Sequence, residues 1–104
     1  MKYSSDYEDK VMKLLKRRLI DEGAKEHNLI DHYTLPNNEV NFIFDLVEID
    51  NNNRILRLFE IKSIQSIKYN SNYIYRLSQK YKAITEAPIY LVYLDEDKQL
   101  QILA

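Results

Sequence analysis

The sequence predicts an α/β domain, with a mixed α+β sheet, and three features indicate it. An amphipathic helical pattern occupies residues 6–22, three runs of β-forming residues follow, and a second helical pattern over 73–86 precedes a fourth run. A strand–helix–strand crossover normally joins two parallel strands of one sheet. We therefore expect a central mixed sheet with a helix on each face.

The length and composition indicate one globular domain. The chain has 104 residues, of which 45% are hydrophobic and 30% charged. We expect a single domain over 1–104, either complete or as one domain of a larger protein. The chain has no cysteine and one glycine, Gly23, which excludes disulfides, thiol catalysis and glycine-rich phosphate loops. Its two histidines cannot form a three-histidine metal site.

The charges are unevenly distributed, although the net charge is only −1. Five basic residues lie between 10 and 20 and five between 62 and 85, with no acid in either segment. Such segregation can create local positive surfaces. No apolar stretch approaches the roughly 20 residues of a membrane span, and no signal peptide is visible, so we expect a cytoplasmic protein without a membrane partner.

The first helix is predicted from its apolar spacing and its end signals. Ser5 and Glu8 fit a capping box at its start, and Gly23 suits the position just past its end. The apolar residues that recur at helical spacing are Val11, Met12, Leu15 and Leu19.

Five strands are predicted from β-forming runs bounded by turn residues. Asn51–Asn53 joins the second and third of them as an antiparallel hairpin. Residues 63–72 are polar and are predicted to form a loop. The predicted strands cover 28–35, 40–50, 54–62, 89–94 and 99–103.

Three charged residues interrupt the apolar hairpin. Asp45 lies within its most apolar stretch, and Glu60 and Lys62 share one face of the next strand. If the hairpin loop is centred near Asn52, Asp45 lies opposite 59–61. The sequence therefore predicts that Asp45, Glu60 and Lys62 converge.

Converging carboxylates repel each other, and a divalent cation relieves that repulsion. Oxygen ligands favour Mg²⁺ or Mn²⁺. A neighbouring lysine can orient a water molecule or neutralise charge that develops on a phosphate. The alternative is structural: Asp45 forms a salt bridge with Arg57 or Lys62 in a small interaction module.

With the order of elements, Asp45 and Glu60-Ile61-Lys62 resemble the PD-(D/E)XK nuclease superfamily over about residues 5–94. Phe44 replaces the proline of the family pattern. The resemblance implies a restriction-endonuclease-like αβββαβ core and magnesium-dependent cleavage of phosphodiester bonds. It implies that Asp45 and Glu60 are catalytic metal ligands, that the Ile61 carbonyl is a further ligand, and that Lys62 positions or activates water.

Glu8 is a further candidate metal ligand. It shares the helix face of the apolar residues, so it should point toward the sheet. The segment around Glu8 resembles the first helix of Holliday-junction-resolvase-like and restriction-type members, which implies that its acid helps to bind metal. The capping box with Ser5 explains Glu8 equally well without a metal.

Residues 68–82 interleave basic and aromatic side chains without an acid. Cations can contact phosphates, and tyrosines can stack on bases. The alternative is a solvated helix whose tyrosines are half-buried. In the family, the helix after the E-x-K strand carries a polar residue that faces the active site, which implies a role for Gln79 or Lys80. The candidate nucleic-acid-binding residues are Lys68, Arg76, Gln79 and Lys80.

The sequence and its resemblance together predict a Mg²⁺- or Mn²⁺-dependent endonuclease domain that acts on DNA in restriction, repair or phage defence. A chain this short has little surface for sequence recognition, and a duplex has two strands to cut, so we expect a homodimer or a partner domain. The alternative is a non-catalytic module of the same fold that binds nucleic acid or protein, because fold does not fix function.

Overall fold

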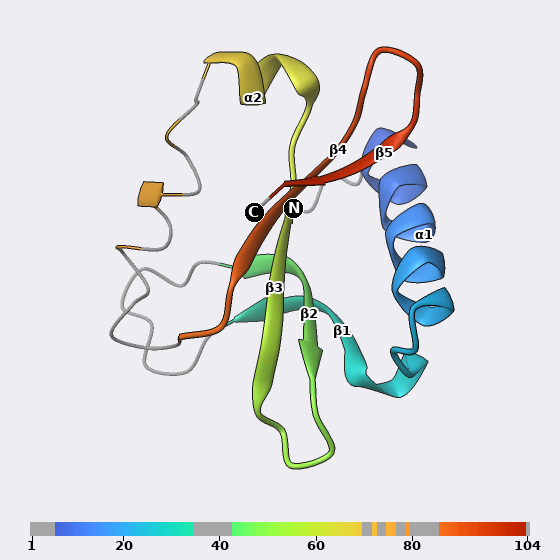
Figure 1. Ribbon diagram of the computed structural model, residues 1–104, viewed down its shortest axis with the longest axis vertical. Coiled ribbons are helices and arrows are strands. Elements are labelled where there is room, and N and C mark those ends of the chain that lie inside the picture. The colour runs from blue at the N-terminus through green and yellow to red at the C-terminus, as the bar shows by residue number, and fades with distance from the viewer. Residues whose placement is uncertain are drawn as a thin grey trace.

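The computed structural model describes residues 6–34, 43–69, 72, 75, 76, 79 and 86–103. Figure 1 shows α1 alongside a sheet and α2 beyond the C-terminal end of β3. Within the described ranges, no helix combines the length and apolar character needed to cross a membrane. The elements are α1 (Asp6–Asp21), the 3₁₀ helix η1 (Glu26–Asn28), β1 (Leu29–Thr34), β2 (Ile43–Ile49), β3 (Ile55–Ile61), α2 (Ile64–Tyr69), β4 (Ile89–Leu94) and β5 (Leu100–Leu103).

The sheet has five strands in the order β1-β2-β3-β4-β5. β3 and β4 are parallel, and the other neighbouring pairs are antiparallel. The predicted α/β class, the mixed sheet, the β2–β3 hairpin and the parallel pairing of β3 with β4 are therefore confirmed. The predicted strand over 40–50 extends into residues that lie outside the described ones.

Apolar side chains form a core on each face of the sheet. On one face, Val11, Leu15 and Leu19 of α1 are fully buried against strand residues that include Phe59. On the other face, a second cluster contains Leu58, the neighbour of Phe59 in β3. Successive strand residues point to opposite faces of the sheet. Because a core covers each face, β3 carries apolar side chains on both. Burial of each such side chain contributes about 2 kcal/mol.

The end of α1 follows the prediction made from Gly23. Gly23 has a φ of +112°, a conformation that favours glycine. The Ala24 N–H donates to the Leu19 carbonyl at 2.9 Å, and the Gly23 N–H donates to the Ile20 carbonyl at 3.0 Å. These two bonds form a Schellman motif, which satisfies carbonyls that the helix leaves unpaired. The predicted capping role of Ser5 lies outside the described residues.

The prediction of a loop over 63–72 is wrong, because α2 lies within it. Ser63 caps this helix: its hydroxyl accepts the Ser66 N–H at 3.2 Å, and its carbonyl accepts the Ile67 N–H at 3.2 Å. The predicted helix over 73–86, which was to cover the second face of the sheet, lies mostly outside the described residues.

Two hairpins of the sheet use the same five-residue turn, at 50–54 and at 95–99. In both, the first residue is an aspartate whose N–H donates to the fifth residue and whose carbonyl accepts the fourth residue's N–H. The aspartate's carboxylate also accepts the N–H groups of the third and fifth residues. The fourth residues, Asn53 and Lys98, have left-handed φ angles of 64° and 60°.

Candidate active site

β2 and β3 separate at the point where Asp45 faces Glu60. The strands are paired at Leu46 and Phe59, and the next residues lie opposite each other, as the hairpin register predicted. Side chains replace the backbone ladder there. The Asp45 N–H donates to Glu60 Oε1 at 3.3 Å, and the Ile61 N–H donates to Asp45 Oδ2 at 2.7 Å. Beyond this point β2 stays paired with β1, and β3 with β4, so the sheet forks.

An irregular stretch of β1 and β2 sets the position of Asp45. Phe44 and Val47 belong to the same apolar cluster, although residues three apart in a regular strand point to opposite faces. On β1, His32 has a left-handed φ of 54°, which is uncommon for a residue other than glycine. The β1–β2 pairing is regular before and after His32 and Asp45. These two residues lie at the same level of the two strands but are not paired with each other. Asp45 consequently lines a cleft beside α1.

Glu60 is the one charged side chain that is buried among the described residues, with 5% of its surface exposed. Burial raises the pKa of Glu60 from 4.5 to about 8, and the repulsion and hydrogen bonding of Asp45 add to this effect. Lys62 partly offsets it, because its positive charge favours the carboxylate form. Near neutral pH, Glu60 therefore tends to keep a proton and to share a hydrogen bond with Asp45.

Lys62 and Tyr7 complete the fork. Lys62 Nζ lies 3.9 Å from Glu60 Oε2. The Tyr7 hydroxyl of α1 donates to the Lys62 carbonyl at 2.8 Å and accepts the Leu94 N–H at 3.2 Å. Tyr7 thus ties the start of α1 to the ends of β3 and β4. The sequence prediction gave Tyr7 no role in the site; its spacing of four residues from Val11 was the available signal.

The cleft beside Asp45 has a volume of about 140 Å³. Glu8 lines it, so the predicted orientation of Glu8 toward the sheet is confirmed. The structure thus places Glu8 and Asp45 in one cleft and joins Asp45 to Glu60. The cleft is lined by Glu8, Asp9, Met12, Asp31, His32, Asp45 and Ile61.

The sequence prediction gave His32 no place at the site. His32 is exposed and lines the cleft opposite Asp45. Asp31 beside it forms an ion pair with Lys16, with 2.6 Å between Oδ1 and Nζ. Only the alignment of β1 with β2 could have indicated His32, because its sequence spacing carries no signal.

The predicted structural alternative for Asp45 is wrong in one respect. Arg57 does not neutralise Asp45; its Nε lies 2.6 Å from Glu48 Oε1, and its guanidinium lies over the Phe59 ring. Asp45 instead accepts the Ile61 N–H. The fork is therefore not held by a strand salt bridge to Arg57.

Asp45 and Glu60 fit magnesium as a pair of oxygen ligands, a number with which Mg²⁺ is often bound while water fills its other positions. When Glu60 is ionised, Asp45 repels it, and a cation between the two carboxylates would relieve that repulsion. In the part of the chain that the structure describes, no group of three or more histidine, aspartate and glutamate side chains is arranged to hold a metal. Glu8 thus lines the cleft but does not form a preformed three-ligand cluster with Asp45 and Glu60.

The predicted nucleic-acid-binding residues are placed only in part. Lys68 forms an ion pair with Glu96, with 3.0 Å between Nζ and Oε1, and both side chains are exposed. Arg76 and Gln79 are exposed, and Lys80 lies outside the described residues. The ion pair of Lys68 weakens its case as a contact to phosphate, whereas Arg76 and Gln79 remain candidates.

Comparison of the chain with protein-family models and with curated proteins finds no match. What the chain does is therefore inferred from its own residues. At the fork of the sheet, the buried carboxyl group of Glu60 lies beside Asp45 and Lys62.

Proposed function

We propose that this domain hydrolyses phosphodiester bonds in DNA with the help of a divalent cation, on a restriction-endonuclease-like αβββαβ core. The observation that carries the proposal is the pair formed by Asp45 and Glu60 at the fork between β2 and β3, with Lys62 Nζ 3.9 Å from Glu60. In metal-dependent hydrolysis of a phosphate ester, a pair of carboxylates can hold the metal ion and an adjacent lysine can orient water or stabilise the phosphate.

A purely structural role for Glu60 accounts poorly for its burial. Neighbouring positions of β3, such as Leu58 and Phe59, hold apolar side chains with no exposed surface. The Glu60 carboxyl group lies at the position after Phe59, and its ionisation beside Asp45 costs stability. The raised pKa of Glu60 reflects this cost. Charged groups that are held at a cost to stability are common at functional sites.

Each residue has a distinct role in the proposal. Mg²⁺ or Mn²⁺, when bound, supplies a Lewis acid and a source of activated water. Asp45 and Glu60 provide the carboxylates that hold it, and Glu8 adds a negative charge across the cleft. The Lys62 amino group orients water or donates to a phosphate oxygen. Tyr7 fixes the Lys62 carbonyl and thereby the end of β3.

The partners in this proposal follow from the size of the domain. Cutting both strands of a duplex requires two sites, which two copies of the chain or a partner domain can supply. DNA as the substrate fits a cytoplasmic location. Among the described strands, β1 and β5 lie at the two edges of the sheet, where a second chain could align.

Two observations favour a second function, a non-catalytic module that binds nucleic acid. The raised pKa of Glu60 keeps its carboxyl group protonated near neutral pH in the absence of a cation, and the described residues contain no three-ligand cluster. In this alternative, the hydrogen bonds of Asp45 and Glu60 serve only to hold β2 and β3 together at the fork. Metal binding and cleavage separate the two functions.

The test is a cleavage assay with Mn²⁺ on supercoiled, branched and single-stranded DNA and on RNA. We expect the wild type to nick or cut DNA with little sequence preference. Lys62→Ala should abolish cutting but keep metal binding, whereas Asp45→Ala should lose both. Lys25→Ala, which removes an exposed lysine from the loop after α1, is the matched control and should cut like the wild type. Equal inertness of the wild type and Lys62→Ala on every substrate would refute catalysis.

A further inference from the structure

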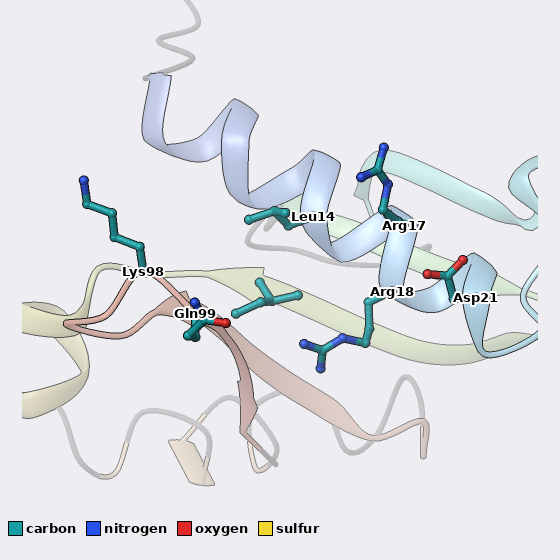
Figure 2. A pocket seen from close by; sticks show the side chains of 7 residues that line it. Leu14, Arg17, Arg18, Asp21, Lys98 and Gln99 are labelled. Carbon is teal, nitrogen blue, oxygen red and sulfur yellow. The ribbon is translucent and has the colours of Figure 1, made fainter.

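We propose that a second site, a basic groove between α1 and the β4–β5 turn, binds the phosphate backbone of DNA. The groove has a volume of about 340 Å³ and lies along α1 (Figure 2). Arg17 and Arg18 of α1 and Lys98 of the turn line it together with Leu14 and Leu100. The choice of DNA as the partner rests on the proposed function, whereas the preference for phosphate rests on the groove itself.

The groove and the acidic cleft lie on different flanks of α1. With about 3.6 residues per turn, residues four apart share a flank of a helix. Glu8 and Met12 line the cleft toward β1, whereas Leu14 and Arg18 line the groove toward β5. Figure 2 shows that Arg18 extends toward the strands while Arg17 extends from the other side of the helix. The groove is therefore separate from the candidate active site.

Of the charged residues that line the groove, three are cations, Arg17, Arg18 and Lys98, and one is an acid, Asp21. Among the described residues, no carboxylate lies within ion-pair distance of Arg17 or Arg18. Lys16, on the opposite flank of α1, is different, because it forms an ion pair with Asp31. Guanidinium groups bind phosphate oxygens through two parallel hydrogen bonds, so arginines without an ion-pair partner among the described residues suit phosphate ligands.

The backbone at Lys98 gives independent support. The two hairpin turns of the sheet are alike, and their fourth residue has a left-handed φ in both. At 53 that residue is asparagine, which tolerates this conformation, but at 98 it is lysine, which does not favour it. Asp95 holds the turn through bonds to backbone N–H groups and to the Gln101 side chain. A lysine at a left-handed position that favours asparagine or glycine motivates a role for its side chain.

The shape of the positive surface favours a chain of phosphates over a single one. Lys10 and Lys13 are exposed and precede Arg17 at helical spacing, so cations extend along α1 beyond the groove. From 10 to 17 the helix rises about 10 Å. That distance corresponds to about three nucleotide rises along one strand of a DNA duplex. A polymer with regularly spaced phosphates therefore matches the surface.

The first test measures binding of a fluorescent DNA duplex by anisotropy, in EDTA so that nothing is cut. We expect Arg17→Gln/Arg18→Gln to bind about tenfold more weakly and to show a shallower salt dependence, by about two in the slope of log K against log salt. Lys25→Gln/Arg54→Gln removes the same charge from exposed positions outside the groove and should change binding less than twofold. An equal loss in both double variants would overturn the proposal, and so would a wild type that binds no duplex.

The second test uses Lys98→Asn, which keeps a residue that tolerates the left-handed conformation but removes the charge. We expect its Tm to rise by about 4 °C while its DNA affinity falls severalfold, which excludes unfolding as the cause of weaker binding. Unchanged affinity would remove the turn from the site. Displacement of DNA by polyglutamate at equal charge concentration would assign the groove to an acidic protein instead.

The outcomes also separate the groove from the proposed function. A wild type that binds DNA through the groove without cutting it would refute catalysis and leave the groove standing. A wild type that cuts DNA, with groove variants that bind as the wild type does, would overturn the groove alone.

Discussion

Glu60→Gln should remove a specific pH dependence of the folding stability. Burial and the neighbouring Asp45 raise the pKa of Glu60 from 4.5 to about 8. Because the folded pKa is raised, the folded state binds the proton more tightly than the unfolded state does. The stability that Glu60 contributes is therefore fully present below about pH 4.5 and is lost as the pH rises through 8.

The size of the effect follows from the shift in pKa. Each pH unit between 4.5 and about 8 reduces the free energy of unfolding by about 1.4 kcal/mol, on the order of 4 to 5 kcal/mol in total. Glutamine is neutral at every pH, keeps the oxygen that accepts the Asp45 N–H, and can donate to the Asp45 carboxylate. At pH 8 the variant should thus be more stable than the wild type by about 3 kcal/mol, which raises the Tm by roughly 12 °C or more.

The assay is urea unfolding followed by circular dichroism between pH 5 and 9, in EDTA. Glu26→Gln, which changes an exposed glutamate far from the fork, is the matched control and should give a curve parallel to that of the wild type. A difference between wild type and Glu60→Gln that stays constant from pH 5 to 8 would refute the raised pKa. The reasoning on Glu60 would also fail if the variant were the less stable protein at pH 8.

Further predictions concern the elements that hold the site. Tyr7→Phe should lower the free energy of unfolding by about 1 to 2 kcal/mol, because the Lys62 carbonyl and the strand beside it lose a hydrogen-bonding hydroxyl; urea unfolding tests this. Leu15→Ala should cost about 2 to 5 kcal/mol because Leu15 is fully buried, whereas Ile20→Ala, at a 42% exposed position, should cost less than about 1 kcal/mol. Hydrogen bonds, first that from the Gln99 N–H, lower the pKa of Asp95 below 3.8, so the wild type should lose stability relative to Asp95→Asn as the pH falls below about 4 in a pH series of thermal melts.

Local periodicity was sufficient to predict most of the fold. The spacing of Val11, Leu15 and Leu19 predicted α1, and Gly23 predicted its end. The asparagine turn after β2 fixed the hairpin register, because a short turn leaves few ways to pair the two strands. That register placed Asp45 opposite Glu60, as the structure has it.

α2 was missed because six residues give too little periodicity to recognise. Its surroundings are rich in polar residues that are typical of loops. The signal lay in Ser63, whose side chain can cap a helix, followed by apolar residues at 64 and 67. Short helices are identified better by their caps than by their faces.

The fork of the sheet depends on contacts that no local pattern contains. The left-handed φ of His32 and the interrupted alternation between Phe44 and Val47 arise where β2 follows β1 while β3 follows β4. Ion pairs such as Lys16–Asp31 likewise join elements far apart in the sequence. The sequence therefore indicated which residues meet at the site but not how the backbone presents them.

Binding of Mn²⁺ to the folded protein tests the central claim most directly, because the claim is that Asp45 and Glu60 hold a divalent cation. Free Mn²⁺ can be followed by its electron paramagnetic resonance signal as protein is added. We expect weak binding to the wild type that strengthens from pH 6 to pH 8 as Glu60 loses its proton, and no binding to Asp45→Ala or Glu60→Gln. Equal binding by the wild type and both variants, or none by any of them at pH 8, would contradict the account.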